Sequence, residues 1–303
     1  MPCKRAVRIA VSQFPVSADV RANGRWIRRC LARAAREGAD LLQTPETSLS
    51  GYAAHAIDDW ADFDWGALAE ETDAACACAR DHGIWLALGS SHYLSRRDKP
   101  TNCLYLISDR GRVVDRYDKR YCTGGDLKMY TAGDHPVTWT LKGFRFGMLI
   151  CYDGCFPRLY EAYERAGVEI MIHSFYNAGH ARPDCLDQIG PAWVQVRAAD
   201  HAMWVFASNA SHRHSCWPSM VGAPDGTAPL RLARHRPGVG TYEVTAVVPP
   251  DPKTGWMHMA HNRARHRRGA LHNGRPSRCR RALDRRCGAG GPELTASGGS
   301  RRR

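Results

Sequence analysis

Short apolar runs alternate with amphipathic helical segments along the first 250 residues of the chain. In the segment from Asn23 to Glu37, Trp26, Ile27, Cys30, Leu31 and Ala34 share one face, which predicts a helix. Several of the strands that these runs predict have apolar residues on both faces, so we expect helical layers on both sides of the sheet structure. An alternation of strands and helices, without an internal repeat, predicts a single α/β domain. Strands are predicted at 6–14, 39–46, 84–91, 102–108, 112–119, 144–151, 168–175 and 202–209, and helices at 23–37, 66–82, 156–166 and 187–200.

The basic character of the chain is concentrated at its end. The net charge is +13, but residues 251–303 alone hold 14 Lys and Arg against 3 acidic residues. Their Arg- and Gly-rich composition offers little apolar surface to offset the entropy of ordering. We therefore predict a globular domain over 1–260 and a largely disordered basic tail over 261–303. Because the domain itself is nearly neutral, we do not expect a nucleic-acid partner.

The twelve cysteines of the chain form no recognisable framework. No C-x₂-C pair occurs, which argues against zinc-ribbon and thioredoxin-like motifs. The stretch SHRHSCW spaces His212, His214 and Cys216 at alternate positions, but we expect solvated loop histidines and no metal there. The N-terminal segment resembles a first strand more than a secretion signal, and no apolar stretch is long enough to cross a membrane. We therefore expect a cytoplasmic protein with reduced thiols.

Three polar residues follow predicted strands directly. Glu46 follows LLQTP, Lys119 follows RVVDRYD and Cys151 follows FRFGMLI. The carboxyl ends of strands in an α/β fold are where ligands bind. A carboxylate, an ammonium and a thiol that meet there could act as a base, an oxyanion donor and a nucleophile.

The neighbourhood of Cys151 is typical of a strand–turn–helix elbow. Phe156 and Pro157 begin a predicted helix just after the cysteine. A helix N-terminus near the thiol is expected to lower its pKa, and the backbone N–H of Tyr152 could face an oxyanion. The residues alone leave two alternatives open: a catalytic cysteine or a buried cysteine at the end of a strand. Cys155 adds a third, because it could pair with Cys151 in redox or metal chemistry.

The stretches TPETSLSGY, YDKRY and GMLICYDGCFP together resemble the nitrilase superfamily, also called carbon–nitrogen hydrolases. The resemblance spans about residues 6–248. It implies a four-layer α-β-β-α sandwich, no metal or cofactor, and packing of two sandwiches into a homodimer that is often extended to larger homo-oligomers. By the resemblance, Glu46 would be the general base, Lys119 the oxyanion stabiliser and Cys151 the nucleophile of a thiol hydrolase.

The chain departs from the family pattern at three positions. Many members carry a second glutamate where this chain has Asp126, one methylene shorter, which leaves open whether it reaches the lysine or the attacking water. Cys155 and Arg158 stand where the family often has Arg and Glu, so a frequent ion pair is absent.

Further candidates for contacts with substrate follow from the same resemblance. The family places a loop at the pocket mouth where this chain has SFYNAGH, so Tyr176 and Asn177 are candidates. Tyr52, just after the Glu46 motif, is also a candidate for contact with substrate.

The sequence thus predicts hydrolysis of a non-peptide C–N bond in a small amide or N-carbamoyl compound. Ammonia or an amine would leave and a cysteine-linked acyl-enzyme would form. Two alternatives stay open: a nitrile hydrolase of the same superfamily, and a catalytically silent binding scaffold.

Overall fold

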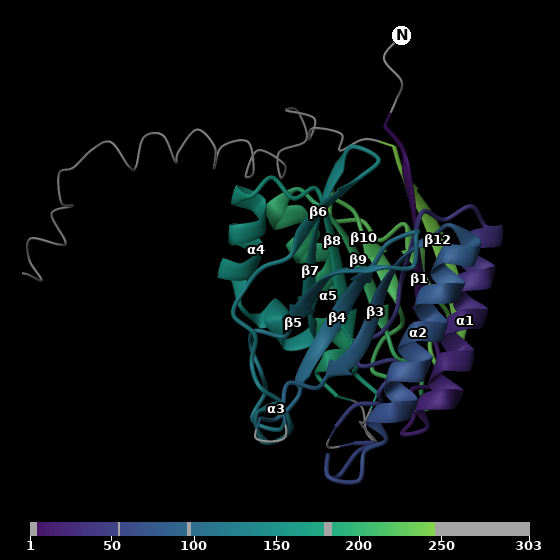
Figure 1. Ribbon diagram of the computed structural model, residues 1–303. Coiled ribbons are helices and arrows are strands. Elements are labelled where there is room, and N and C mark those ends of the chain that lie inside the picture. The colour runs from purple at the N-terminus through teal and green to yellow at the C-terminus, as the bar shows by residue number, and fades with distance from the viewer. Residues whose placement is uncertain (1–4, 54, 96–97, 179–183, 246–303) are drawn as a thin grey trace, which may run out of the picture. The chain divides into compact units, whose positions relative to one another are not determined.

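Two six-stranded sheets form the centre of the protein (Figure 1). The computed structural model describes residues 5–53, 55–95, 98–178 and 184–245, all within one compact unit. The first sheet has the order β12-β1-β2-β3-β4-β5, and the second has the order β11-β10-β9-β8-β7-β6. The strands of the first sheet are β1 (Val7–Gln13), β2 (Leu41–Gln43), β3 (Trp85–His92), β4 (Thr101–Ile107), β5 (Val113–Asp118) and β12 (Gly238–Val244). Those of the second are β6 (Thr138–Leu141), β7 (Phe144–Ile150), β8 (Ile170–Phe175), β9 (Trp204–Asn209), β10 (Met220–Gly222) and β11 (Leu230–Arg231).

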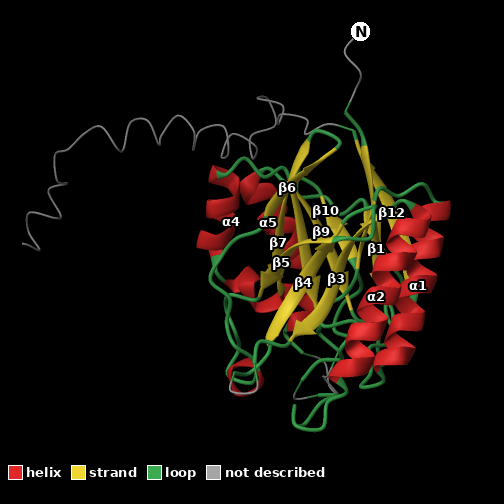
Figure 2. Ribbon diagram, in the orientation of Figure 1, coloured by secondary structure: helices red, strands yellow, loops and turns green. Residues whose placement is uncertain are grey.

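Helices cover the outer face of each sheet. Helices α1 (Val20–Arg36) and α2 (Trp65–His82) pack on the first sheet, and α4 (Pro157–Arg165) and α5 (Leu186–His201) lie against the second (Figure 2). Two short helices, η1 (Cys151–Cys155) and α3 (Asp126–Met129), lie in connections. The predicted four-layer α-β-β-α sandwich is confirmed.

Capping residues explain where the outer helices begin and end. The Asp19 side chain accepts a hydrogen bond from the Ala22 backbone N–H at 2.9 Å, so α1 begins before the predicted Asn23. The side chain of Asp64 caps α2 in the same way. Helix α2 ends at Gly83, whose φ of 63° is left-handed and therefore favours glycine. The four predicted helices are thus present, with boundaries shifted by a few residues.

Strand direction brings several loops to one edge of the sandwich. Strands β1, β2 and β3 are mutually parallel, as are β7, β8 and β9. Two antiparallel steps, from β3 to β4 and from β4 to β5, return β5 to the direction of β3. The carboxyl ends of β2, β5, β7 and β8 therefore point to the same edge, and the backbone N–H of Glu46 bonds the carbonyl of Phe175 across the two sheets.

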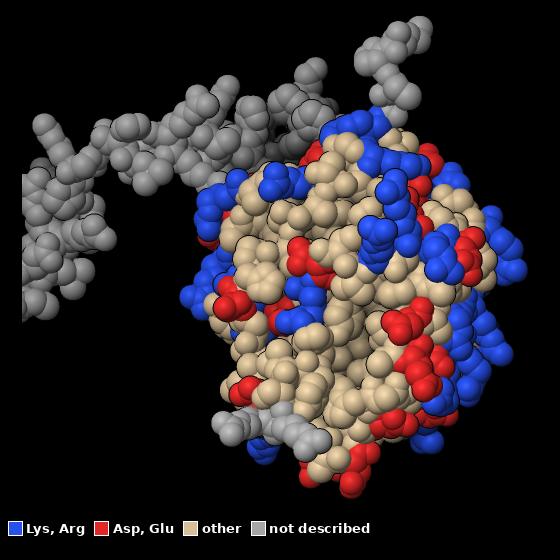
Figure 3. Space-filling model, viewed as in Figure 1, with Lys and Arg blue, Asp and Glu red and all other residues tan. Residues whose placement is uncertain are grey.

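The surface of this unit carries both signs of charge. Lys and Arg alternate with Asp and Glu over the face in Figure 3, so that face presents no continuous basic surface. None of the helices among the described residues is long and apolar enough to cross a membrane. The boundary predicted between residues 260 and 261, and the basic tail beyond it, lie outside the described residues.

Candidate active site

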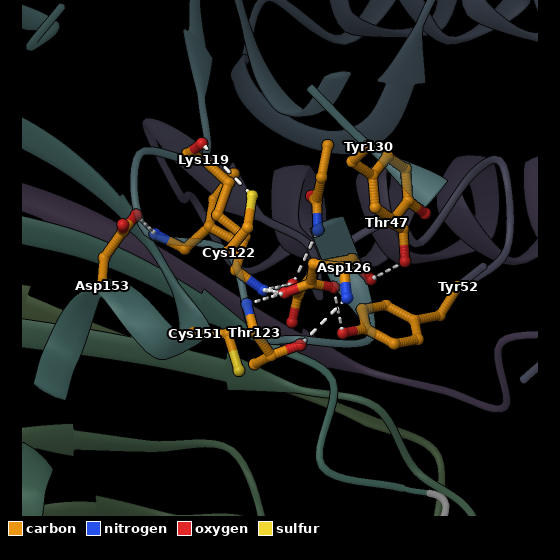
Figure 4. Close-up of polar contacts among 12 residues, drawn as sticks. Thr47, Tyr52, Lys119, Cys122, Thr123, Asp126, Tyr130, Cys151 and Asp153 are labelled. Carbon is orange, nitrogen blue, oxygen red and sulfur yellow. Dashed lines mark hydrogen bonds and ion pairs between the residues drawn. The ribbon is translucent and has the colours of Figure 1, made fainter. Parts of the chain in front are cut away.

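Glu46 and Lys119 form a fully buried ion pair at the common strand edge. Lys119 Nζ lies 2.7 Å from Glu46 Oε1, and both side chains are 0% exposed. Glu46 follows β2 and Lys119 follows β5, as the sequence predicted. Figure 4 shows Cys151, from the end of β7, beside Lys119 and Asp126. The structure therefore brings the three predicted catalytic residues together.

The backbone of Cys151 has an unusual conformation. Its φ is 44°, a left-handed value that costs energy for a residue with a side chain. Strand β7 ends at Ile150, and η1 begins at Cys151 and leads into α4. The strand–turn–helix elbow predicted from the sequence is confirmed, with a 3₁₀ turn as its middle part. Strain of this kind persists only where the surroundings hold it in place.

Asp153 holds one side of this elbow. Its buried carboxylate accepts hydrogen bonds from the backbone N–H of Ile150 at 3.0 Å and of Tyr121 at 2.8 Å. The hydroxyl of Tyr117 donates a third, at 2.8 Å. The carboxylate therefore joins the start of the elbow to the loop that follows Lys119.

His173, on β8, holds the other side of the elbow. Its Nε2 lies 3.2 Å from the carbonyl oxygen of Cys151, and its Nδ1 lies 2.7 Å from the hydroxyl of Tyr160. Burial lowers the pKa of His173 to about 3, so the imidazole is neutral near pH 7. A neutral ring has one donor, and only an Nε2–H can bond the carbonyl, so Nδ1 accepts from the tyrosine. Sequence analysis missed this residue.

Asp126 is a second carboxylate on Lys119. Its Oδ2 lies 2.8 Å from Lys119 Nζ and accepts from the Thr123 backbone N–H at 2.9 Å. Its Oδ1 accepts from the hydroxyl of Tyr52 at 2.6 Å. The shorter side chain therefore reaches the lysine, which answers one question that the sequence left open. Because both oxygens are occupied, this carboxylate fixes the lysine more readily than it could activate water.

Asn102, on β4, orients Glu46. The Asn102 side-chain nitrogen donates to Glu46 Oε1 at 2.8 Å, the same oxygen that Lys119 contacts. Glu46 Oε2 is buried and has no hydrogen-bond partner in the described structure. One oxygen is thus held by two donors while the other is left for proton exchange. Sequence analysis missed Asn102 too, although it opens a predicted strand.

The pKa values of Glu46, Lys119 and Cys151 are set by burial together with the charges of neighbouring groups. Burial, the largest effect, raises the pKa of Glu46 against the opposing charge of Lys119. Burial would lower the pKa of Lys119, but the negative charges of Glu46 and Asp126 raise it well above its usual value. Burial and the charge of Glu46 raise the pKa of Cys151 well above its usual value, while Lys119 lowers it. The sequence-based expectation of a lowered thiol pKa was wrong, because burial and the charge of Glu46 raise it. The resting thiol is protonated, and a base with a raised pKa lies close to it.

The other predicted contact residues surround the thiol. The rings of Tyr52 and Tyr176 stack with centroids 4.7 Å apart. The Asn177 side-chain nitrogen lies 3.8 Å from Cys151 Sγ. Tyr152 is 36% exposed and packs its ring edge-on against Phe156, so only its backbone N–H is a candidate oxyanion donor.

The two substitutions beside the nucleophile have local explanations. Cys151 and Cys155 are both free thiols. The guanidinium of Arg158 lies over the ring of Tyr121 at 5.0 Å. Arg197, from α5, donates to the carbonyl of Gly154 at 3.4 Å and brings a positive charge near Cys155. A cation from another helix thus lies where the family often carries arginine.

No cluster of three or more His, Cys, Asp or Glu side chains that could hold a metal occurs within the described ranges. The rings of His212 and His214 are neighbours, with centroids 5.7 Å apart. Cys216, in contrast, is buried.

Comparison with known proteins identifies the family. The family model described as carbon–nitrogen hydrolase matches residues 8–248, and the chain belongs to this family. A deaminated glutathione amidase of Yersinia enterocolitica is 30% identical over 238 residues, which cover 67% of this chain and 78% of the relative. A hydrolase from the pqqF 5′ region of Pseudomonas protegens is 29% identical over 238 residues, 74% of this chain and 78% of the relative.

Solved structures share the fold. A cysteine-to-alanine mutant of the Nesterenkonia AN1 amidase, from the nitrilase superfamily, superposes with a TM-score of 0.72 at 22% identity and covers 88% of this chain and 98% of its own. A glutamate-to-glutamine mutant of the same amidase has a TM-score of 0.73 at 22% identity, with the same coverage of both chains, and carries the acetamide moiety of fluoroacetamide on its active-site cysteine. This protein is thus a carbon–nitrogen hydrolase with the nitrilase fold.

Proposed function

We propose that the protein is a thiol amidase that hydrolyses a small amide or N-carbamoyl compound through an acyl-enzyme on Cys151. The observation that carries the proposal is the buried Glu46–Lys119–Asp126 set next to a cysteine held in a left-handed elbow. Amidases among the relatives, and the covalent adduct on the cysteine of the Nesterenkonia amidase, support the choice of chemistry.

In the proposed first half-reaction, Glu46 Oε2 takes the proton of the Cys151 thiol, and the sulfur attacks the carbonyl carbon. Lys119 Nζ and the backbone N–H of Tyr152 stabilise the oxyanion that forms. Protonated Glu46 then gives its proton to the leaving nitrogen, the C–N bond breaks, and ammonia or an amine departs. A thioester on Cys151 is left.

In the second half-reaction, Glu46 deprotonates a water molecule, which attacks the thioester carbon. The C–S bond breaks, the acid leaves, and the thiolate recovers its proton from Glu46. The raised pKa of Glu46 suits a group that must accept and return a proton twice in each cycle.

Several further properties belong to this proposal. We propose residues 1–260 as the hydrolase domain, a cytoplasmic location, and a homodimer or larger homo-oligomer. Light scattering coupled to size-exclusion chromatography measures the last of these, and truncation after residue 260 with retained turnover supports the domain boundary.

The test is ammonia release from a panel of primary amides, N-carbamoyl compounds and nitriles, together with release of a primary amine from deaminated glutathione, which is included because of the relatives' names. Cys151→Ala should abolish release while the circular dichroism spectrum stays unchanged. Cys155→Ala, four residues away and also a free thiol, is the matched control and should stay active.

The panel separates the alternatives. Turnover of nitriles alone would identify a nitrile hydrolase. No turnover of any compound, together with a Cys151 that iodoacetamide does not label, would support a binding scaffold. Amide hydrolysis that survives Cys151→Ala would refute the proposed nucleophile.

A further inference from the structure

The side-chain amide of Asn177 lies between a buried tryptophan and the sulfur of Cys151. Trp217 Nε1 lies 2.9 Å from Asn177 Oδ1, and Asn177 Nδ2 lies 3.8 Å from Cys151 Sγ. Trp217 is 1% exposed and Asn177 is 9% exposed. The three groups therefore form a chain that runs from the core to the thiol.

The chemistry of the indole fixes which end of the amide faces the sulfur. An indole N–H can donate a hydrogen bond but cannot accept one, so the amide atom facing Trp217 must be the oxygen. The NH₂ group of Asn177 then has to point toward Cys151. A flipped amide would place two N–H donors against each other and a carbonyl oxygen against the sulfur.

The backbone around this chain is held by further hydrogen bonds. Asn209 Oδ1 accepts from the Asn177 backbone N–H at 2.9 Å, while its side-chain nitrogen donates to the Trp217 carbonyl at 2.8 Å. The backbone N–H of Cys216 donates to the Asn177 carbonyl at 2.9 Å. Asn209 thereby joins the two segments, a structural role that the sequence could not separate from substrate contact.

The indole itself has little room to move. Its ring packs edge-on against Phe175, with centroids 4.7 Å apart. A Cβ at Gly190 of α5 would lie 2.3 Å from Trp217 Nε1, so glycine is needed there to admit the indole. A donor fixed in this way can hold the orientation of an amide throughout a reaction cycle.

We propose that Trp217 is a positioning residue that keeps the N–H of Asn177 directed at Cys151 Sγ, where it stabilises the thiolate formed during reaction. The inference rests on the proposed function, in which Cys151 is the nucleophile. A hydrogen bond to a charged acceptor is about twice as strong as one to a neutral acceptor. The contact therefore favours the thiolate over the thiol, against the burial that favours the thiol.

The test compares Trp217→Phe with Trp204→Phe in the full-length protein. Both changes remove an indole N–H, but the Nε1 of Trp204 is buried without a hydrogen-bond partner in the described structure. The rate of Cys151 alkylation by iodoacetamide is measured against pH, with the labelled site identified by mass spectrometry. In Trp217→Phe the midpoint should rise by about one pH unit and the rate at fixed pH should fall about 10-fold, as expected for a lost charge-assisted hydrogen bond. Trp204→Phe should keep the wild-type profile.

A second variant separates positioning from packing. Asn177→Asp keeps an acceptor for the Trp217 indole but replaces the N–H donor by a carboxylate oxygen, so the midpoint should also rise. In the double variant, Trp217→Phe should add little to Asn177→Asp, because its effect acts through the amide. Additive shifts would show that Trp217 acts by packing alone, and an unchanged midpoint in both single variants would overturn the proposal.

Turnover gives a further readout. If an amide substrate is found, Trp217→Phe should lower kcat about 10-fold with KM changed by less than about 3-fold, because the contact is made to the thiolate rather than to substrate. The alkylation assay needs no substrate. A protein that turns over nothing yet shows the predicted midpoint shift would refute the proposed amidase function and leave the positioning role intact.

Discussion

Asp126 Oδ2 lies 2.8 Å from Lys119 Nζ, although aspartate is one methylene shorter than the glutamate common in the family. Asp126 is the first residue of α3, and the Thr123 backbone N–H donates a hydrogen bond to the same oxygen, Oδ2. With Glu46 on its other side, Lys119 carries its charge between two acidic groups inside the protein. Lys119 therefore stays protonated, as a residue that stabilises an oxyanion must be.

We expect Asp126→Asn to weaken both activity and stability. The change leaves the buried lysine with a single carboxylate, and we expect a loss of about 1–3 kcal/mol in the free energy of unfolding and a fall of about 10- to 100-fold in kcat. Urea denaturation and steady-state kinetics measure the two effects. Asp134→Asn, at an almost fully exposed carboxylate, is the control and should change neither. A wild-type kcat in Asp126→Asn would show that Glu46 alone maintains the lysine.

Tyr52→Phe should act through the same carboxylate. It removes the hydroxyl that donates to Asp126 Oδ1 at 2.6 Å but keeps a ring to stack on Tyr176. Loss of a hydrogen bond to a charged group should cost about 1–2 kcal/mol of stability, and we expect kcat to fall about 3- to 10-fold. The matched variant Tyr105→Phe instead removes a hydroxyl that is bonded to His92 at 2.6 Å. An equal fall in kcat in both variants would point to a general effect of destabilisation.

The three proposed catalytic residues could be predicted to lie close together because each follows a strand. Glu46, Lys119 and Cys151 carry groups that can act in catalysis, and parallel strands bring the positions after their ends to one edge. The alternation of strand-like apolar runs with amphipathic helical segments likewise predicted the layers of the sandwich.

The supporting residues could not be predicted, because their roles depend on contacts between distant segments. Asn102 lies at the start of an apolar run and His173 lies inside one, and a buried polar residue has many structural uses at such positions. Trp217 was indistinguishable from any core aromatic until its indole was seen to face Asn177. The direction of the thiol pKa also escaped prediction, since it depends on how completely the sulfur is desolvated.

His173 makes stability depend on pH in a defined direction. The pKa of His173 is about 3 in the folded protein, against an ordinary value of 6.5. Between these values the unfolded chain binds a proton that the folded protein does not, so stability falls as pH falls below about 6.5. Each pH unit in that window costs about 1.4 kcal/mol, and about 1.5 units of the window lie between pH 7 and pH 5, so the wild type should lose about 2 kcal/mol through this residue over that range.

Urea denaturation of His173→Gln at the two pH values tests this dependence. Glutamine offers a donor for the Cys151 carbonyl and an acceptor for Tyr160 but takes up no proton, so its loss between pH 7 and pH 5 should be smaller by about 2 kcal/mol. His135→Gln, at a half-exposed ring, should behave like the wild type. Equal losses in His173→Gln and the wild type would mean that the imidazole is charged in the folded protein.

Gly154 and His173 should prove energetically coupled. A Cβ added at Gly154 would lie 2.9 Å from His173 Cε1, closer than real Cβ contacts come, so Gly154→Ala must displace the imidazole that bonds the Cys151 carbonyl. We expect a loss of about 1–3 kcal/mol in the free energy of unfolding and slower alkylation of Cys151, because the elbow loses one of its supports.

A double-mutant cycle with His173→Ser measures this coupling. Removing the ring makes room for the new methyl group, so Gly154→Ala should cost about 1–2 kcal/mol less in the His173→Ser background than in the wild type. Gly124→Ala, where an added Cβ would meet nothing within 4 Å, controls for the general effect of replacing a glycine in a nearby loop. An equal cost of Gly154→Ala in both backgrounds would show that the added methyl group does not displace the imidazole. The left-handed backbone of Cys151 would then be held without His173.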